Sequence, residues 1–305
     1  MNFRSVAIDD YDMIWDYCAE YGENSCQHSF INIFTLYEKY GSKICEENGF
    51  LYVLRSHMSI DGVRVYLFPM GKGDERDAIE KILEDAHSYG CKAGFQTITE
   101  EKRNFLEREF PHVFQIEEVR DYAEYLHLAD NLVNLPGKAF AKKRYDVNLF
   151  RRVYAGHMEE LFLSKSNIDE VLAFERKWLA QTVAIHDKKA LELEYREIER
   201  QLSYFDELKI SGIIIRIDGE IQGFVYGAPI SDSCYYVLIE KGNREIDDIY
   251  RILHQDIVRL CARDYKYINR EEDVGVPGLR KAKLSYKPDI LLSKYTATEI
   301  TDGVI

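Results

Sequence analysis

A basic segment of the sequence carries residues that could hold an anionic substrate. Residues 137–152 contain six cations, and Asp146 is the one carboxylate among them. The segment therefore carries +5, whereas the whole chain carries −13 and the remainder −18. Aromatic residues lie between the cations, a mixture that suits phosphates together with stacked bases. The candidate substrate-binding residues here are Lys138, Lys142, Lys143 and Arg144. The alternative is a surface helix whose cations pair with acidic residues downstream.

A second segment, residues 269–287, could hold carboxylates close to cations. Glu271 and Asp273 follow a predicted strand, and a loop of glycine and proline precedes a predicted helix with Arg280 and Lys283 on one face. Either carboxylate could orient or deprotonate an acceptor amine or hydroxyl, and the cations could steady an oxyanion or a phosphate. The alternative is a loop held by salt bridges, without a role in chemistry.

A glycine-containing loop at 240–245 joins a predicted strand to a predicted helix. Free N–H groups at such a helix start favour phosphate, so Gly242, Asn243 and Arg244 are candidate cofactor-binding residues. The loop matches neither a P-loop nor the glycine fingerprint of dinucleotide-binding proteins. It has one glycine between Glu240 and Glu245 and is a poor cradle for pyrophosphate. Simple turn geometry is the alternative.

The elements that must position these residues are predicted in the same order in each half of the chain. In the first half, strands are expected at 50–54, 63–68 and 93–98, helices at 78–86 and 100–109, and a long strand region at 113–128. In the second half, strands are expected at 213–217, 222–228, 234–239, 265–268 and 289–295, and helices at 246–261 and 279–286. This order predicts two domains, 1–135 and 136–305, with charged helices inserted at about 167–208.

Several classes of protein are disfavoured. Residues 221–239 hold a single charge, but Gly223, Gly227 and Pro229 interrupt them, so a β-hairpin is expected and not a membrane span. The six cysteines form no C-x-x-C pair and the histidines no H-x-x-x-H pair, so no metal site is expected. The acidic first 16 residues are unlike an export signal. We therefore expect a cytoplasmic protein without an integral membrane segment.

The two charged segments also carry a resemblance. Residues 132–138, 142–144 and 148, with 269–271 and 278–288, resemble an uncharacterised bacterial family related to the C-terminal domain of phosphatidylglycerol lysyltransferase. Ser25, Phe30 and Asn32 extend the resemblance toward the N-terminus. It implies an α+β fold of two tandem Gcn5-related N-acetyltransferase-like (GNAT-like) domains, each a mixed sheet flanked by helices, similar to Fem-type peptidyltransferases. These motifs add Asn148, Asn269, Arg270 and Tyr286 to the candidate substrate-binding residues.

The resemblance implies group transfer. Lysyltransferases move an aminoacyl group from aminoacyl-tRNA to a lipid headgroup and carry a membrane-spanning half, which is not found here. We therefore expect a soluble acyl- or aminoacyltransferase that takes aminoacyl-tRNA through the basic segment and passes the group to a small amine or hydroxyl acceptor. Two alternatives stay open: an N-acyltransferase that uses acyl-CoA as donor to a small amine, and a binding module without catalysis. No other cofactor is expected.

Overall fold

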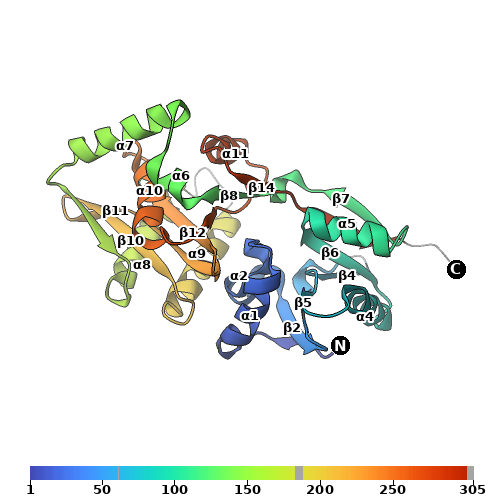
Figure 1. Cartoon of the computed structure of the whole chain (residues 1–305). Coiled ribbons are helices and arrows are strands. Elements are labelled where there is room, and N and C mark those ends of the chain that lie inside the picture. The colour runs from blue at the N-terminus through green and yellow to red at the C-terminus, as the bar shows by residue number, and fades with distance from the viewer. Residues whose placement is uncertain (61, 183–187, 301–305) are drawn as a thin grey trace. The chain divides into compact units, whose positions relative to one another are not determined.

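Two compact units are built from interleaved parts of the chain. The computed structural model describes residues 1–60, 62–182 and 188–300 (Figure 1). Unit 1 comprises Met1–Tyr125, Glu272–Lys281 and Leu291–Ile305, and unit 2 comprises Leu126–Glu271 and Ala282–Ile290. The domain limits 1–135 and 136–305 stay a prediction about where each fold repeat begins.

Unit 1 contains a mixed sheet that the C-terminal strand completes. Its strand order is β1-β2-β3-β4-β6-β15-β7, with β5 paired to β3. β4 and β6 run parallel, and β15 lies antiparallel between β6 and β7. The strands are β1 (Arg4–Ser5), β2 (Ser42–Glu47), β3 (Phe50–Arg55), β4 (Val63–Tyr66), β5 (Met70–Gly71), β6 (Lys92–Ile98), β7 (Phe114–Glu118) and β15 (Tyr295–Glu299).

Apolar residues at helical spacing hold the helices of unit 1 on this sheet. Ala78, Ile79, Ile82 and Ala86 of α4 are almost fully buried in a core with strand residues such as Phe95. Side chains begin two helices: Asp74 accepts from the N–H of Arg76 at 2.8 Å, and Thr99 accepts from Lys102 at 3.4 Å. The helices are α1 (Tyr11–Tyr21), α2 (Phe30–Thr35), α3 (Tyr37–Tyr40), α4 (Glu75–Ser88) and α5 (Glu100–Glu109).

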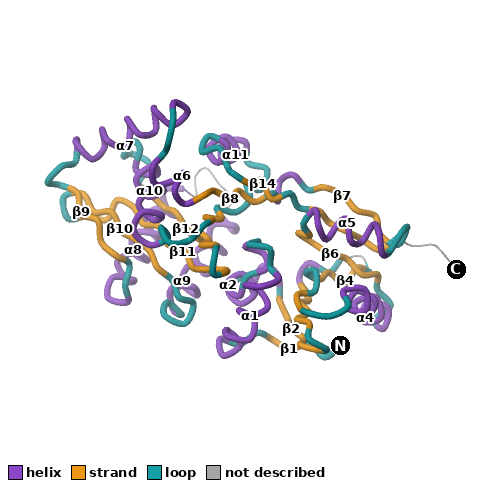
Figure 2. The backbone as a smooth tube through the Cα atoms, viewed as in Figure 1, coloured by secondary structure: helices purple, strands orange, loops and turns teal. Residues whose placement is uncertain are grey.

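The second sheet has the order β14-β8-β13-β12-β11-β10-β9 (Figure 2). Neighbouring strands are antiparallel from β9 to β12, whereas β12 and β13 run parallel. The strands are β8 (Glu124–Leu128), β9 (Met158–Phe162), β10 (Ser211–Ile217), β11 (Glu220–Ser231), β12 (Cys234–Gly242), β13 (Tyr267–Asn269) and β14 (Ile290–Leu292).

Helices cover both faces of the second sheet. Alternation along β11 turns Val225 toward the core formed with α10, while Phe224 and Tyr226 face the other side. On that other side Phe224 packs edge-on against Phe174 of α8, and Tyr226 donates to Gln201 of α9 at 2.6 Å. The remaining helices are α6 (Ala129–Asn134), α7 (Ala141–Val153), α8 (Ile168–Thr182), α9 (Lys188–Ser203), α10 (Ile249–Cys261) and α11 (Pro277–Leu284).

Most predicted elements are present, and the differences are local. The hairpin expected at 221–239 is confirmed as β11 and β12, and the charged block 167–208 contains α8 and α9, apart from residues 183–187, which lie outside the described part. The prediction of one strand region at 113–128 is wrong, because a 3-10 turn at Arg120–Tyr122 separates β7 from β8. The predicted helix 279–286 begins and ends two residues earlier, as α11.

The predicted final strand at 289–295 is two short strands, because β14 joins the second sheet and β15 the first. In the described ranges, none of the helices has the length and apolar character that would let it span a lipid bilayer.

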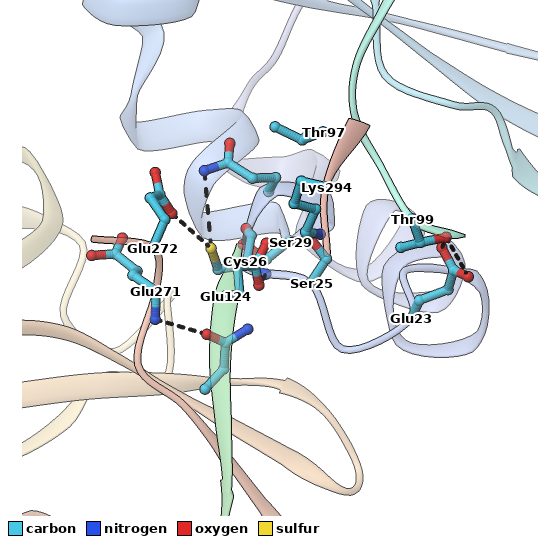
Figure 3. Close-up of polar contacts among 12 residues, drawn as sticks. Glu23, Ser25, Cys26, Ser29, Thr97, Thr99, Glu124, Glu271, Glu272 and Lys294 are labelled. Carbon is cyan, nitrogen blue, oxygen red and sulfur yellow. Dashed lines mark hydrogen bonds and ion pairs between the residues drawn. The ribbon is translucent and has the colours of Figure 1, made fainter. Parts of the chain in front are cut away.

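A buried ion pair ties together distant parts of unit 1 (Figure 3). The side chains of Lys294 and Glu124 are fully buried, with 2.9 Å between Nζ and Oε1. Ser25 accepts from Lys294 at 2.6 Å and donates to Glu124 at 2.7 Å. The second carboxylate oxygen accepts from the backbone N–H of Cys26 at 2.9 Å. The cluster therefore fixes the 25–26 turn, the start of β8 and the entry to β15.

We predict that Lys294→Met lowers the free energy of unfolding by about 3–5 kcal/mol, because Glu124 is left buried without its countercharge. The double variant Lys294→Met/Glu124→Leu removes both charges, and its free energy of unfolding should fall by clearly less. Urea unfolding at neutral pH measures both changes. Equal losses in the single and the double variant would contradict an ion pair whose halves need each other.

Candidate active site at the carboxyl end of β13

The parallel pairing of β12 with β13 stops where β13 ends. β12 and β13 pair over three residues each, Cys234–Tyr236 with Tyr267–Asn269. β13 then ends, whereas β12 continues to Gly242. Side chains from the segment after β13 and from α11 therefore meet the continuing edge of β12. Six of the thirteen sequence-predicted residues of unit 2 gather at this place.

On one face, the carboxylate of Glu271 is held in place by its neighbours. Asn269 is fully buried, and its Oδ1 accepts from the backbone N–H of Glu271 at 2.8 Å. The phenol of Tyr236 donates to the Glu271 carboxylate. The backbone of Glu271 lies in the left-handed region, at φ 58°, which is uncommon for a residue with a side chain. This arrangement fixes a partly exposed carboxylate at the strand end, where it can accept a proton.

On the other face, Arg270 and Lys283 lie near the largely buried carboxylate of Glu240. Arg270 pairs with Glu240 at 2.9 Å, and Lys283 donates to the carbonyl oxygen of Arg270 at 2.6 Å. Lys143 of α7 donates to Ser285 at 2.8 Å, and its ammonium lies 4.0 Å from the ring centre of Tyr286. Lys143, Arg270, Lys283 and Tyr286 are thus brought together, although α7 lies far from α11 in the sequence.

Burial shifts the pKa values of this group. It raises the pKa of Glu240, an effect opposed by Arg270. Burial also lowers the pKa of Lys143, and repulsion from the charge of Arg251 acts in the same direction. The pKa of Tyr286 is raised to about 12, mainly by burial, so its phenol stays protonated. Positive charge is thus concentrated where solvent screens it weakly.

Strand alternation explains why the two groups lie on opposite faces. Ile268 is paired with Tyr235, and both belong to the core packed on α10. The next pair, Asn269 with Tyr236, therefore faces the other side of the sheet. Arg270 returns to the α10 side, where it meets Glu240. The end of β13 thus presents a carboxylate on one face and cations on the other.

The other predicted residues of the basic segment either bond to groups within unit 2 or are exposed. Arg144 donates to the backbone carbonyl oxygens of Leu135 and Gly137. Lys142 pairs with Asp146 at 3.0 Å, although its side chain is 80% exposed. Lys138, in a 3-10 turn before α7, and Asn148 are exposed.

Asp273 and Arg280 belong to unit 1, where they pair with each other. Asp273 is fully buried and accepts from Arg280 at 2.9 and 2.6 Å, from Tyr125 at 2.5 Å and from the N–H of Gly275 at 3.0 Å. Arg280 also pairs with Asp121 at 2.6 Å. Burial opposes ionisation of Asp273, but hydrogen bonds from Arg280 and Tyr125 outweigh it and hold its pKa well below the usual range. A carboxyl with such a low pKa is a weak base. The contacts of Asp273 are those of a residue that anchors its loop.

The loop with Gly242, Asn243 and Arg244 uses its polar groups internally. The N–H of Asn243 donates to Gln222 at 2.7 Å, and Gly242 accepts from the indole of Trp178 at 3.0 Å. A Cβ at Gly242 would lie 2.8 Å from Ile249, so close packing accounts for this glycine. Arg244 is exposed near the Trp178 ring. Asn243 also lines a cavity of about 250 Å³ beside α8.

Four residues of this site were not among the predicted ones: Tyr236, Glu240, His127 and His254. Tyr236 and Glu240 lie on β12, where strand alternation alone would have suggested their faces. His254 sits beside the apolar positions of the predicted helix 246–261 and is 2% exposed. His127 lies within the region predicted as one long strand, whose partner β13 is 140 residues away in sequence. Pairings at that distance leave no local signal.

Comparison with known proteins decides the family. The model of the phosphatidylglycerol lysyltransferase C-terminal domain family matches residues 19–298, nearly the whole chain. The chain belongs to this family. The resemblance inferred from the two charged segments is thereby confirmed.

Solved structures agree with this assignment. A conserved protein of unknown function from Bacteroides thetaiotaomicron is 30% identical, with a TM-score of 0.92 over 98% of this chain and 100% of that one. The structure of L-PGS from Bacillus licheniformis is 17% identical, with a TM-score of 0.67 over 96% of this chain and 93% of that one.

More distant structures show the fold. A tandem GNAT protein from the clavulanic acid biosynthesis pathway, 8% identical, aligns over 100% of this chain and 99% of its own with a TM-score of 0.52. FemX, 10% identical, aligns over 98% of both chains with a TM-score of 0.50. The predicted α+β fold of tandem GNAT-like domains is confirmed. An uncharacterised protein of Mycoplasmoides gallisepticum is 23% identical over 56% of this chain, and the match spans about half, 54%, of that relative.

We predict that Asp273→Asn lowers the free energy of unfolding at pH 7 by about 2–3 kcal/mol, the value of charge-assisted hydrogen bonds to a buried carboxylate. The pKa of Asp273 is lowered by folding from 3.8. Its stabilisation is therefore complete above that value and is lost as the pH falls toward the folded-state pKa. Urea unfolding of both proteins from pH 7 down to pH 3 should show the difference narrowing only below about pH 4. A difference that is constant with pH would contradict this origin.

Proposed function

We propose that this protein transfers an acyl or aminoacyl group from an activated ester to an amine or hydroxyl acceptor, at the end of β13. Membership of the lysyltransferase family and the tandem GNAT-like fold support group transfer. The observation that carries the assignment is the arrangement around β13, with Glu271 on one face and Lys143, Arg270 and Lys283 on the other.

In the proposed reaction the acceptor nitrogen or oxygen attacks the carbonyl carbon of the donor ester. A new bond forms at that carbon and the bond to the donor oxygen breaks. Glu271 takes the proton released by the acceptor and returns a proton to the leaving oxygen. Asn269 and Tyr236 position the Glu271 carboxylate. Because the ester is already activated, correct placement of the two substrates supplies much of the rate.

The hydrogen bonds of the 242–244 loop and the charges of the basic segment favour an aminoacyl-tRNA donor over acyl-CoA. The 242–244 loop offers little to a pyrophosphate, since the N–H groups of Asn243, Glu245 and Ile246 are already bonded within the protein. Glu245, Asp247 and Asp248 follow directly and would repel it. Lys138 and Lys142, in contrast, are exposed on a segment of reversed charge, where the phosphates of an RNA can be bound.

The first test is retention of charged tRNA by the purified protein on a filter. The triple variant Lys138→Ala/Lys142→Ala/Lys143→Ala should lose retention by at least about tenfold at low salt, since three phosphate contacts disappear. The matched control, Lys72→Ala/Arg263→Ala/Lys266→Ala, removes the same charge from exposed positions elsewhere and should bind normally. Absence of retention for the unaltered protein, or equal loss in the control, would refute a tRNA donor.

The second test separates catalysis from binding. Glu271→Gln keeps the size of the side chain and its contact with Tyr236 but removes the proton acceptor. Consumption of the aminoacyl ester in the presence of a pool of small amines should slow by about 100-fold or more, with tRNA retention unchanged. If the variant consumes the ester as fast as the original protein, Glu271 is not the base. Marked thermal stabilisation by acetyl-CoA would instead favour the acyl-CoA alternative.

A further inference from the structure

A group of buried nitrogen atoms on the α10 face of the second sheet is not used by the reaction above. His127 is fully buried and His254 is 2% exposed. Within the described residues, no hydrogen-bond partner is found for either ring nitrogen of His127, for Nε2 of His254 or for Nε of Arg270. A buried polar atom without a hydrogen-bond partner has lost its contact with water and destabilises the folded protein. Four such atoms in one region therefore indicate a group that the protein chain does not itself supply.

The atoms belong to one electrostatic environment. Burial, together with repulsion from Arg270 and Lys283, lowers the pKa of His127 to about 3, so the ring is neutral at pH 7. Burial also lowers the pKa of His254, with further contributions from Arg270, His127, Lys143 and Lys283. Among these groups, Arg270 and Lys283 act on the carboxylate of Glu240, and Lys143 adds a third cation near His254. Each neutral imidazole carries one N–H and one acceptor nitrogen, so the region offers N–H donors together with an excess of positive charge.

The pattern of donors distinguishes between anions. A carboxylate is commonly bound by an Arg fork through two parallel hydrogen bonds, but the terminal nitrogen of Arg270 already pairs with Glu240. The remaining donors come from separate side chains on β8, α10 and the segment after β13. Donors on three separate elements can reach different oxygens of a tetrahedral phosphate. The Tyr286 ring, 3.9 Å from that of His254, borders the group.

We propose that His127, His254 and Arg270, with Lys143 and Lys283 beside them, bind a phosphate group of a substrate. The proposal rests on the proposed transfer function and names the part of the donor that this face recognises. Three sources share the chemistry: a nucleotide phosphate near the esterified end of an RNA, the phosphates of CoA, and free phosphate. Their relative affinities identify the source.

Nitrogen NMR of the full chain with ¹⁵N-labelled histidines tests the proposal directly. Inorganic phosphate, 5′-AMP and CoA are titrated separately. We expect saturable shifts of the His127 and His254 ring signals, while His28 and His157 stay unchanged. Tighter binding of 5′-AMP than of CoA identifies a nucleotide source, tighter CoA binding an acyl-CoA source, and equal binding of all three a free phosphate site. No movement of either ring up to about 10 mM of any probe, well beyond ordinary small-ligand affinities, overturns the proposal.

Variants add an independent measurement. His254→Gln and Lys143→Gln should each weaken phosphate binding by about tenfold, and the partly exposed Lys143 allows the test if the buried substitution disturbs folding. His28→Gln is the matched control, since His28 is buried in unit 1 and its ring nitrogens also have no partner in the described chain. Unchanged affinity in folded Lys143→Gln and His254→Gln refutes the site. Phosphate binding without tRNA retention refutes only the proposed donor, whereas tRNA retention with unmoved histidines refutes only this site.

Discussion

The buried pair of Lys294 and Glu124 is the constraint on which the architecture of unit 1 depends. Neither charge is tolerated in the interior without the other, and Ser25 donates to the same carboxylate oxygen as Lys294, while the N–H of Cys26 satisfies the second oxygen. The pair joins a turn near the N-terminus, the first residue of β8 and the residue before β15. The geometric requirement of one ion pair thus fixes where the chain leaves the first sheet and where it returns.

Alternation of side chains along a strand has a comparable effect in unit 2. Successive residues from Ile268 to Glu271 project to different sides, so a short segment supplies a core residue, a carboxylate with the amide that holds it, and a cation for the opposite face. β12 does the same with Glu240 and Lys241, since Lys241 pairs with Glu194 and lies over Trp178 on the α8 side. A compact site with two chemically different faces follows from strand geometry, without any specialised loop.

The sequence predicts those features that depend on residues close together along the chain. The helix 246–261 and the hairpin 221–239 were recognisable because periodicity and turn residues lie within a few residues of one another. The division of 113–128 between two sheets was not recognisable, because it depends on partners that are distant in sequence. The charge and glycine content of the segment 269–287 led to the prediction that it takes part in chemistry. The sequence did not reveal that Asp273 forms an ion pair with Arg280 or that His127 and His254 lie near Arg270, since these contacts arise through tertiary packing.

The position of β15 has a consequence for synthesis of the protein. This strand, at residues 295–299, lies between β6 and β7, which are made much earlier. While the ribosome is still translating the second unit, β6 and β7 expose edges that lack their final neighbour. At ordinary translation rates the nascent first unit waits on the order of ten seconds or longer for its last strand. During that interval the unpaired strand edges are open to incorrect pairing with other strands.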